Sequence, residues 1–144
     1  MSFRTGRRVE FRDTDAAGIA HFSAFFPWME SAEHEMLRSV EIPVLPDQSS
    51  DPDAVSWPRV RASCDYTSAV RFEDLLNIDV SVSKIGRSSV QYSFDFSRRG
   101  SEGDSAPVAS GSTVVVCCRI HPGGGLEKVV IPAAIRAKLE SLLQ

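Results

Sequence analysis

The sequence predicts an α+β fold in which one long helix covers one face of an antiparallel sheet of about five strands. Between Phe22 and Val40, apolar residues recur at steps of three and four, which is the spacing of an amphipathic helix. Five other segments alternate apolar and polar residues or are rich in β-branched and aromatic residues, as strands are. The expected order is β-α-β-β-β-β-α. A helix of ~17 residues is ~25 Å long, enough to cover such a sheet.

We expect the long helix from Ala24 to Val40, with Ser23 as its N-cap and Pro27 in its first turn, where a missing N–H has no cost. Its apolar face is expected to contain Phe22, Phe25, Phe26, Met29, Ala32, Met36, Leu37 and Val40. A short helix is expected at Ala133 to Leu143, and the proline-rich segment Pro43 to Ser56 is expected to be a surface loop.

The alternation is cleanest from Leu76 to Val82 and from Val90 to Phe96, and loose in the first strand, where Phe11 falls on the apolar face. The expected strands are Phe3 to Arg12, Trp57 to Tyr66, Leu75 to Ser83, Ser88 to Ser97 and Val108 to Ile120. Ile85-Gly86-Arg87 and Arg98 to Ala106 are expected to connect the middle strands. An uncovered sheet edge would suit pairing with a second copy.

Composition excludes several classes of protein. The 144 residues, 42% of them hydrophobic and 24% charged, suit one globular domain over residues 1–144. Sixteen Lys and Arg against nineteen Asp and Glu give a net charge of −3, which argues against nucleic acid and anionic membranes as partners. No apolar run is long enough for a membrane span, and the polar start lacks the pattern of a signal peptide, so we expect a cytoplasmic protein.

The three cysteines do not form a disulfide framework. Cys117, Cys118 and His121 could be read as metal ligands, but neighbouring residues of a strand point to opposite faces. We therefore expect ordinary strand residues, and no metal site.

The junction between the first strand and the long helix is the segment most suited to chemistry. It places Asp13, Asp15, Gly18 and His21 just before a helix, whose first N–H groups lack partners and can polarise a carbonyl. A nearby carboxylate can act as a nucleophile or as the base for a water. The alternative is that both aspartates only shape the turn.

Residues 13–19, Asp-Thr-Asp-Ala-Ala-Gly-Ile, followed by an aromatic helix with Trp28-Met29-Glu30, resemble the signature of the 4-hydroxybenzoyl-CoA thioesterase family of hotdog-fold acyl-CoA hydrolases. Tyr66 with residues 71–75, and the hairpin at residues 84–89, are similar to later parts of the family pattern. The resemblance extends in order from about Val9 to Val116.

This resemblance implies a hotdog sheet wrapped around a central helix, a homodimer or homotetramer, and hydrolysis of an acyl-CoA thioester with no metal or cofactor, CoA being part of the substrate. Asp15 matches the catalytic carboxylate, as nucleophile or general base. The backbone N–H of Phe22 matches the donor that polarises the carbonyl. An aromatic residue at this position is more similar to members that act on aromatic acyl groups.

Several other residues have more than one possible role. Members acting on short-chain substrates have a tyrosine and a histidine where this chain has His21 and Phe22, so His21 either takes part in the chemistry or orients and packs. Asp13 is expected to be a turn and cap residue, and Gly18 to serve a close approach or a positive φ. Glu30 matches a family glutamate that could position water, or else forms an ion pair, the simplest with His34.

CoA phosphates require cations, and Lys84 and Arg87 lie in the hairpin that resembles the nucleotide-contacting region of the family. Other arginines that compete with them are Arg59, Arg61 and Arg71. Two further functions stay open: a hotdog dehydratase using His21 and Glu30, and an acyl-CoA-binding module without turnover. A serine hydrolase is disfavoured because no Gly-x-Ser-x-Gly motif occurs.

Overall fold

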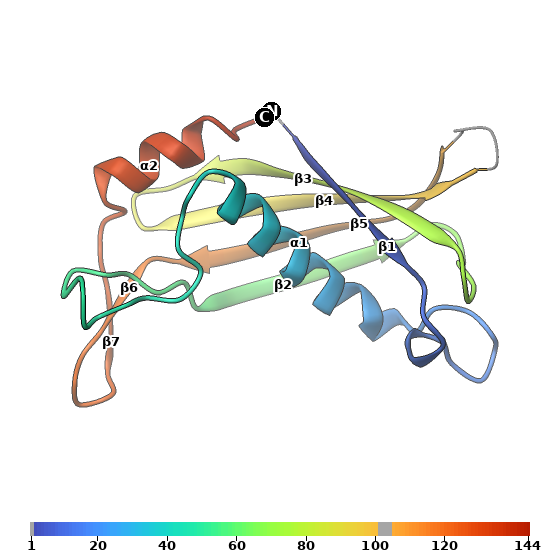
Figure 1. Ribbon diagram of the computed structural model, residues 1–144, viewed down its shortest axis with the longest axis horizontal. Coiled ribbons are helices and arrows are strands. Elements are labelled where there is room, and N and C mark those ends of the chain that lie inside the picture. The colour runs from blue at the N-terminus through green and yellow to red at the C-terminus, as the bar shows by residue number, and fades with distance from the viewer. Residues whose placement is uncertain (1, 101–104) are drawn as a thin grey trace.

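A five-stranded antiparallel sheet packs against one long helix in the computed structural model, which describes residues 2–100 and 105–144 (Figure 1). The strands lie in the order β1-β3-β4-β5-β2. Their bounds are β1 (Phe3–Arg8), β2 (Arg59–Tyr66), β3 (Leu75–Ile85), β4 (Ser89–Arg99) and β5 (Ser105–Val116). Helix α1 (Phe25–Ser39) lies across one face of the sheet. The predicted fold class is confirmed.

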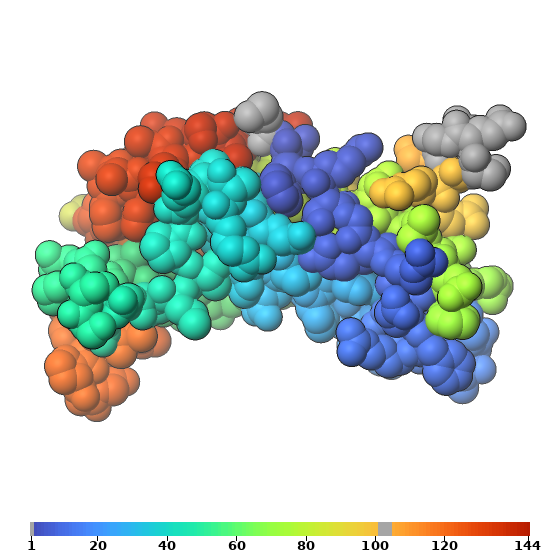
Figure 2. Space-filling view, viewed as in Figure 1, coloured from blue at the N-terminus to red at the C-terminus, as the bar shows by residue number. Residues whose placement is uncertain are grey.

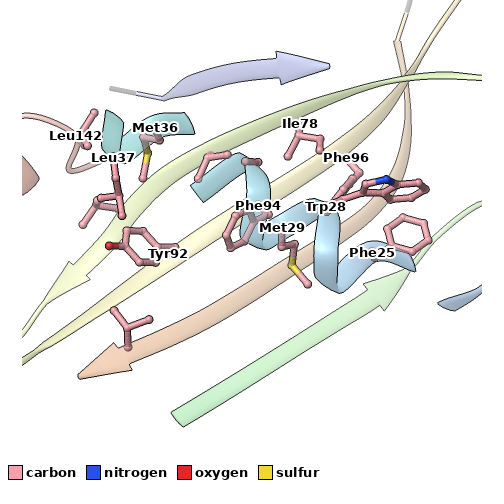
Figure 3. Packing of buried hydrophobic residues seen from close by; sticks show 14 of the residues in the cluster. Phe25, Trp28, Met29, Met36, Leu37, Ile78, Tyr92, Phe94, Phe96 and Leu142 are labelled. Carbon is pink, nitrogen blue, oxygen red and sulfur yellow. The ribbon is translucent and has the colours of Figure 1, made fainter. Parts of the chain in front are cut away.

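The core lies between α1 and the middle of the sheet. Phe25, Trp28 and Met29 of α1 point toward the strands, and Met36 and Leu37 fill the other end near Leu142 (Figure 3). The facing residues of β3 and β4 are at most 2% exposed, as their alternation predicted: Leu76, Ile78, Val80, Val82, Val90, Tyr92, Phe94 and Phe96. The Phe25 ring packs edge-on against both Trp28 and Phe96 at 5.1 Å. This packing fixes the position of the helix start above the sheet.

The first strand is shorter than predicted. It ends at Arg8, and a 3-10 turn, η1 (Phe11–Asp13), follows instead of strand to Arg12. The cause is a capping box in which the Glu10 and Asp13 side chains each accept the other residue's backbone N–H. Phe11 is consequently 76% exposed and packs only edge-on against Phe72, at 5.8 Å, so its expected place on the apolar face was wrong.

The helix begins differently from the prediction. A 3-10 turn, η2 (Phe22–Ala24), precedes α1, and its N-cap is His21, whose ring nitrogen Nδ1 accepts the Ser23 N–H. Ser23 is therefore not the cap. Phe22 is 63% exposed, which corrects its expected place in the apolar face. Pro27 does lie in the first turn of α1.

The predicted strand Val108 to Ile120 is two strands. β5 ends at Val116, and β6 (Cys118–Ile120) pairs instead with β7 (Leu126–Lys128), a strand that the sequence did not predict. The chain changes sheet at Cys117, and both Cys117 and Cys118 are buried. All three cysteines are free.

The remaining elements differ only at their ends. β2 starts after Trp57, β3 extends through Ile85, and the second helix, α2 (Ala133–Glu140), stops before Leu143. The predicted loop Arg98 to Ala106 is shortened by β4 and β5, and its residues 101–104 lie outside the described residues.

The loop between β1 and α1 lies at one corner of the molecule. The backbone N–H of Val9 donates to the Asp74 carbonyl and that of Ala20 to the Val70 carbonyl, each at 2.8 Å, so the loop is held beside the start of β3. In the surface view it forms the blue corner opposite the orange β6–β7 hairpin (Figure 2).

Candidate active site

A short two-stranded turn shapes the loop that contains both aspartates. Thr14 and Ala20 form a β-bridge, and the His21 N–H donates to the Asp13 carbonyl at 2.7 Å. The Asp13 side chain accepts the Glu10 N–H at 2.8 Å. Asp13 is thus the turn and cap residue that the sequence predicted.

One carboxylate oxygen of Asp15 accepts a hydrogen bond within this turn, and the other accepts none from the described residues. Its Oδ1 accepts the Ala17 N–H at 2.8 Å. Its backbone N–H donates to the Ile19 carbonyl and its carbonyl accepts the Gly18 N–H, both at 2.9 Å. The backbone of Asp15 is therefore fixed, while one of its carboxylate oxygens is left for other partners.

Gly18 has a φ of +80°, the left-handed region in which side chains are strained. A Cβ built there would meet its nearest atom, Nη1 of Arg71, at 3.8 Å, which is an ordinary contact. Positive φ, rather than close approach, is the reason for glycine. The same geometry places the Arg71 guanidinium beside the Asp15 loop.

Asp15 and Phe22 line the same cleft, whose volume is about 320 Å³. The rest of its wall consists of Ile19, Ala20, Phe25, Tyr66, Thr67, Ser68, Ala69 and Val70. These residues come from the loop, the helix start, the end of β2 and the segment that follows it. The structure therefore brings together a carboxylate, a helix start and an aromatic wall.

The backbone around Phe22 is held closely. Tyr66 Oη donates to the Phe22 carbonyl at 2.8 Å, and the Ser23 N–H donates to His21 Nδ1 at 3.2 Å. The Ser23 hydroxyl also lies 2.6 Å from Nδ1. Because the Ser23 N–H can only donate, Nδ1 is an acceptor, which places the proton of a neutral ring on Nε2. Among the described residues, no hydrogen bond uses the Phe22 N–H.

The His21 ring stacks on the Phe22 ring, with centroids 4.4 Å apart. His21 is not part of the lining of the Asp15 cleft. The sequence left open whether His21 takes part in the chemistry or orients and packs, and its spacing did not indicate that the ring caps the helix start.

Glu30 lies in a different cleft, of about 260 Å³, with Phe26 and Arg59 in its wall. Its carboxylate pairs with Arg59 Nη1 at 3.1 Å, rather than with His34. Arg59 Nη2 also binds both oxygens of Glu33, at 2.8 and 2.9 Å. The ion-pair interpretation of Glu30 is supported, with a partner on β2 that sequence spacing does not reveal.

Glu33 is 3% exposed, and it was not among the predicted residues. Burial raises the pKa of its carboxyl, and the Arg59 guanidinium opposes that rise. Burial also raises the pKa of the neighbouring Tyr92 hydroxyl. Since α1 buries this carboxylate against the sheet, Arg59 acts as its structural counter-ion.

The two predicted phosphate ligands, Lys84 and Arg87, lie at the opposite end of β3 from the Asp15 loop (Figure 1). At ~3.3 Å per residue, the length of β3 separates them by roughly 33 Å. Arg87 lines a groove of about 520 Å³ together with Ser88, Ser89 and Lys128. Within one chain, the structure does not bring these cations to Asp15.

Among the described residues, no three His, Cys, Asp or Glu side chains gather as metal ligands would. In the same part of the chain, no helix has the length and apolar character that a bilayer crossing requires.

The architecture is shared with solved acyl-CoA thioesterases. A 4-hydroxybenzoyl-CoA thioesterase, solved as an aspartate-to-asparagine mutant complexed with 4-hydroxybenzoyl-CoA, matches with a TM-score of 0.86 at 21% identity, covering 96% of this chain and 98% of that one. A 1,4-dihydroxy-2-naphthoyl-CoA thioesterase from Synechocystis matches with a TM-score of 0.82 at 21% identity over 99% and 98%. The chain is thus a hotdog-fold protein.

The sequence places it in a family. The profile of the Thioesterase superfamily matches residues 17–103, more than half of the chain. A 1,4-dihydroxy-2-naphthoyl-CoA hydrolase of Prochlorococcus marinus subsp. pastoris is 27% identical over 94% of this chain and 87% of its own length. The 1,4-dihydroxy-2-naphthoyl-CoA hydrolase of Prochlorococcus marinus strain NATL1A is 31% identical over 67% of each chain. The protein belongs to the Thioesterase superfamily.

Proposed function

We propose that this protein hydrolyses an aromatic acyl-CoA thioester to the free acid and CoA, with Asp15 as the reacting carboxylate and no metal or cofactor. The observation that carries the proposal is that Asp15 and the start of the helix, at Phe22, line one cleft. The carboxylate can act on a carbonyl while an N–H group stabilises the oxygen on which charge develops.

Two routes use the same carboxylate. In the first, Asp15 attacks the thioester carbonyl, the C–S bond breaks, CoA leaves as a thiolate, and water hydrolyses the resulting anhydride. In the second, Asp15 takes a proton from a water whose oxygen attacks the carbonyl. The C–S bond then breaks, CoA leaves as a thiolate, and Asp15 returns its proton to the thiolate or to solvent. Label in the Asp15 carboxylate after a single turnover in oxygen-labelled water would establish the anhydride route, because the general-base route places no water oxygen on Asp15.

The Phe22 N–H is the proposed oxyanion donor. It has no acceptor among the described residues, although the groups on either side of it are hydrogen-bonded. A donor held in place before the reaction costs no reorganisation when the tetrahedral oxygen forms. Because the donor belongs to the backbone, changing the Phe22 side chain should matter less than moving the helix start.

The aromatic acyl group is proposed from the walls of the cleft. Phe22, Phe25 and Tyr66 contribute three rings beside Asp15, and aromatic rings pack well against one another. Both solved neighbours named above, and the two Prochlorococcus hydrolases, have ring-bearing acyl groups in their names. A gentisyl-CoA thioesterase, which matches at 26% identity with a TM-score of 0.74 over 96% of this chain and 99% of that one, agrees with this.

We propose supporting roles for His21 and Glu30. His21 orients the helix start, since Nδ1 is used by Ser23 and its ring rests on Phe22. Replacement of His21 by Ala should then lower activity through a displaced helix start. Glu30 is held by Arg59, and we propose that it organises the α1–β2 interface.

The CoA phosphates require cations within reach of the thioester. Arg71 lies beside the Asp15 loop, whereas Lys84 and Arg87 are at the far end of the sheet. We propose a homodimer or homotetramer in which a second copy supplies this hairpin. Strand β2 is the edge proposed for pairing, because six of its eight residues are exposed.

The geometry favours hydrolysis over the two alternatives. A dehydratase would need His21 and Glu30 to act on one substrate, but His21 caps its own helix, and Glu30 lies in another cleft beside Arg59. A binding module would need no carboxylate in the cleft that holds the acyl group.

The test is release of CoA thiol from a panel of substrates, followed with a chromogenic disulfide reagent: 4-hydroxybenzoyl-, 1,4-dihydroxy-2-naphthoyl-, gentisyl- and acetyl-CoA. We expect the aromatic substrates to have the higher kcat/KM, with a chelator having no effect. Binding of acyl-CoA without release of thiol would support the binding module, and release only from acetyl-CoA would contradict the aromatic substrate class.

A further inference from the structure

Tyr66 connects the end of β2 to the start of the helix. Its hydroxyl donates to the Phe22 carbonyl at 2.8 Å across a separation of 44 residues. The ring packs edge-on against Phe25, with centroids 5.1 Å apart, so it cannot turn away without losing this contact. The same side chain lines the cleft that contains Asp15.

Three hydrogen bonds hold the backbone on either side of the Phe22 N–H. The N–H before it, of His21, is bound by the Asp13 carbonyl at 2.7 Å. The carbonyl of Phe22 is bound by Tyr66, and the N–H after it, of Ser23, is bound by the His21 ring. The Phe22 N–H itself has no partner in the described chain. Of the three anchors, Tyr66 alone comes from a distant part of the sequence, so it fixes the helix start relative to the sheet.

We propose that Tyr66 is a positioning residue whose hydroxyl, by binding the Phe22 carbonyl, holds the start of the helix so that the Phe22 N–H can polarise the thioester carbonyl. This inference rests on the proposed thioesterase function. Tyr66 acts through Phe22 and need not touch the reacting atoms. Loss of its hydroxyl should therefore weaken transition-state stabilisation more than substrate binding.

The hydroxyl is available for this role at any working pH. Burial raises the pKa of Tyr66 to about 12, so the group stays protonated and remains a hydrogen-bond donor. Of the two tyrosines in the chain, the other is Tyr92, which is 1% exposed and lies within β4. It provides a matched control for removing a tyrosine hydroxyl outside the cleft.

The test compares Tyr66→Phe with Tyr92→Phe and wild type. Tyr66→Phe keeps the ring against Phe25 and removes only the hydroxyl. We expect kcat to fall about fivefold, which corresponds to ~1 kcal/mol, with KM changed less than about twofold. Tyr92→Phe should retain the kcat of wild type at a temperature where all three proteins are folded.

Hydrogen exchange provides a readout that does not depend on turnover. The Ser23 and Ala24 N–H groups, which donate to His21, should exchange faster in Tyr66→Phe than in Tyr92→Phe. Unchanged kcat together with unchanged exchange would overturn the inference, as would a loss carried wholly by KM. If wild type releases no thiol from any substrate, the proposed function fails, and the exchange result still decides whether Tyr66 holds the helix start.

Discussion

Replacement of Gly18 by Ala tests how the loop places Asp15. Gly18 has a φ of +80°, and a side chain in this region costs roughly 1–2 kcal/mol. The nearest atom to an added Cβ is 3.8 Å away, so the substitution adds backbone strain and almost no steric overlap. The expected perturbation is therefore a strained turn.

The strain acts directly on Asp15. The Gly18 N–H donates to the Asp15 carbonyl, and the next carbonyl, of Ile19, accepts the Asp15 N–H, both at 2.9 Å. A turn that relaxes to negative φ at residue 18 loses these two hydrogen bonds. A strain of 1–2 kcal/mol corresponds to a factor of about 5–30 in the fraction of molecules that keep the turn. We expect kcat/KM to fall by about that factor.

Gly124→Ala is the matched control, because Gly124 has a φ of +93° in the β6–β7 hairpin and an added Cβ meets nothing within 4 Å. The assays are thiol release and urea unfolding at a fixed protein concentration. Both variants should lose about 1–2 kcal/mol of unfolding free energy, and only Gly18→Ala should lose activity. Wild-type kcat/KM in Gly18→Ala, or an equal loss in Gly124→Ala, would refute the reasoning.

Two further predictions concern stability. A Cβ at Gly111 would overlap Met29 Sδ under α1, so Gly111→Ala should lower the unfolding free energy by about 1–3 kcal/mol in denaturant titrations. The control, Gly123→Ala, should change the unfolding free energy by less than about 0.5 kcal/mol. Equal denaturation midpoints for the two variants would contradict the close packing of α1 on β5. Burial lowers the pKa of His34 below 6.5, so its contribution to stability is present above pH 6.5 and is lost as pH falls through the lower folded-state value. His34→Gln should therefore lose less stability on acidification than wild type, and parallel pH profiles would argue against this.

The long helix and the central strands could be predicted because their signals are local and repeated. The three- and four-residue spacing gives α1 to within one residue at each end, and the alternation in β3 and β4 gives the face that packs against it. Many side chains contribute to each of these patterns, so no single interaction decides them.

The ends of helices and strands were harder to predict because single side chains determine them. The Glu10–Asp13 capping box ends β1, and His21 rather than Ser23 caps the helix start. Neither the capping box nor the His21 cap changes the pattern of apolar and polar residues from which the elements were predicted. In the same way, the apolar run continues through Cys117 without a break, although β6 pairs with β7 there rather than continuing β5.

The candidate site was predictable only where its residues are close in sequence. Asp15 and Phe22 are seven positions apart, and both line the cleft. Tyr66 reaches Phe22 through the placement of β2, which sequence spacing does not encode. Conversely, a resemblance suggested Lys84 and Arg87, but only the position of the Asp15 loop at the start of β3 shows how far from Asp15 they lie.

The central claim is that the Asp15 carboxylate performs the hydrolysis. Asp15→Asn keeps the shape of the side chain and its acceptor oxygen for the Ala17 N–H, and removes the charge. The control is Asp95→Asn, at an exposed position of β4. In thiol release from 4-hydroxybenzoyl-CoA, we expect kcat of Asp15→Asn to fall by about 10²–10⁴-fold while Asp95→Asn matches wild type. A kcat for Asp15→Asn equal to that of wild type would contradict the account.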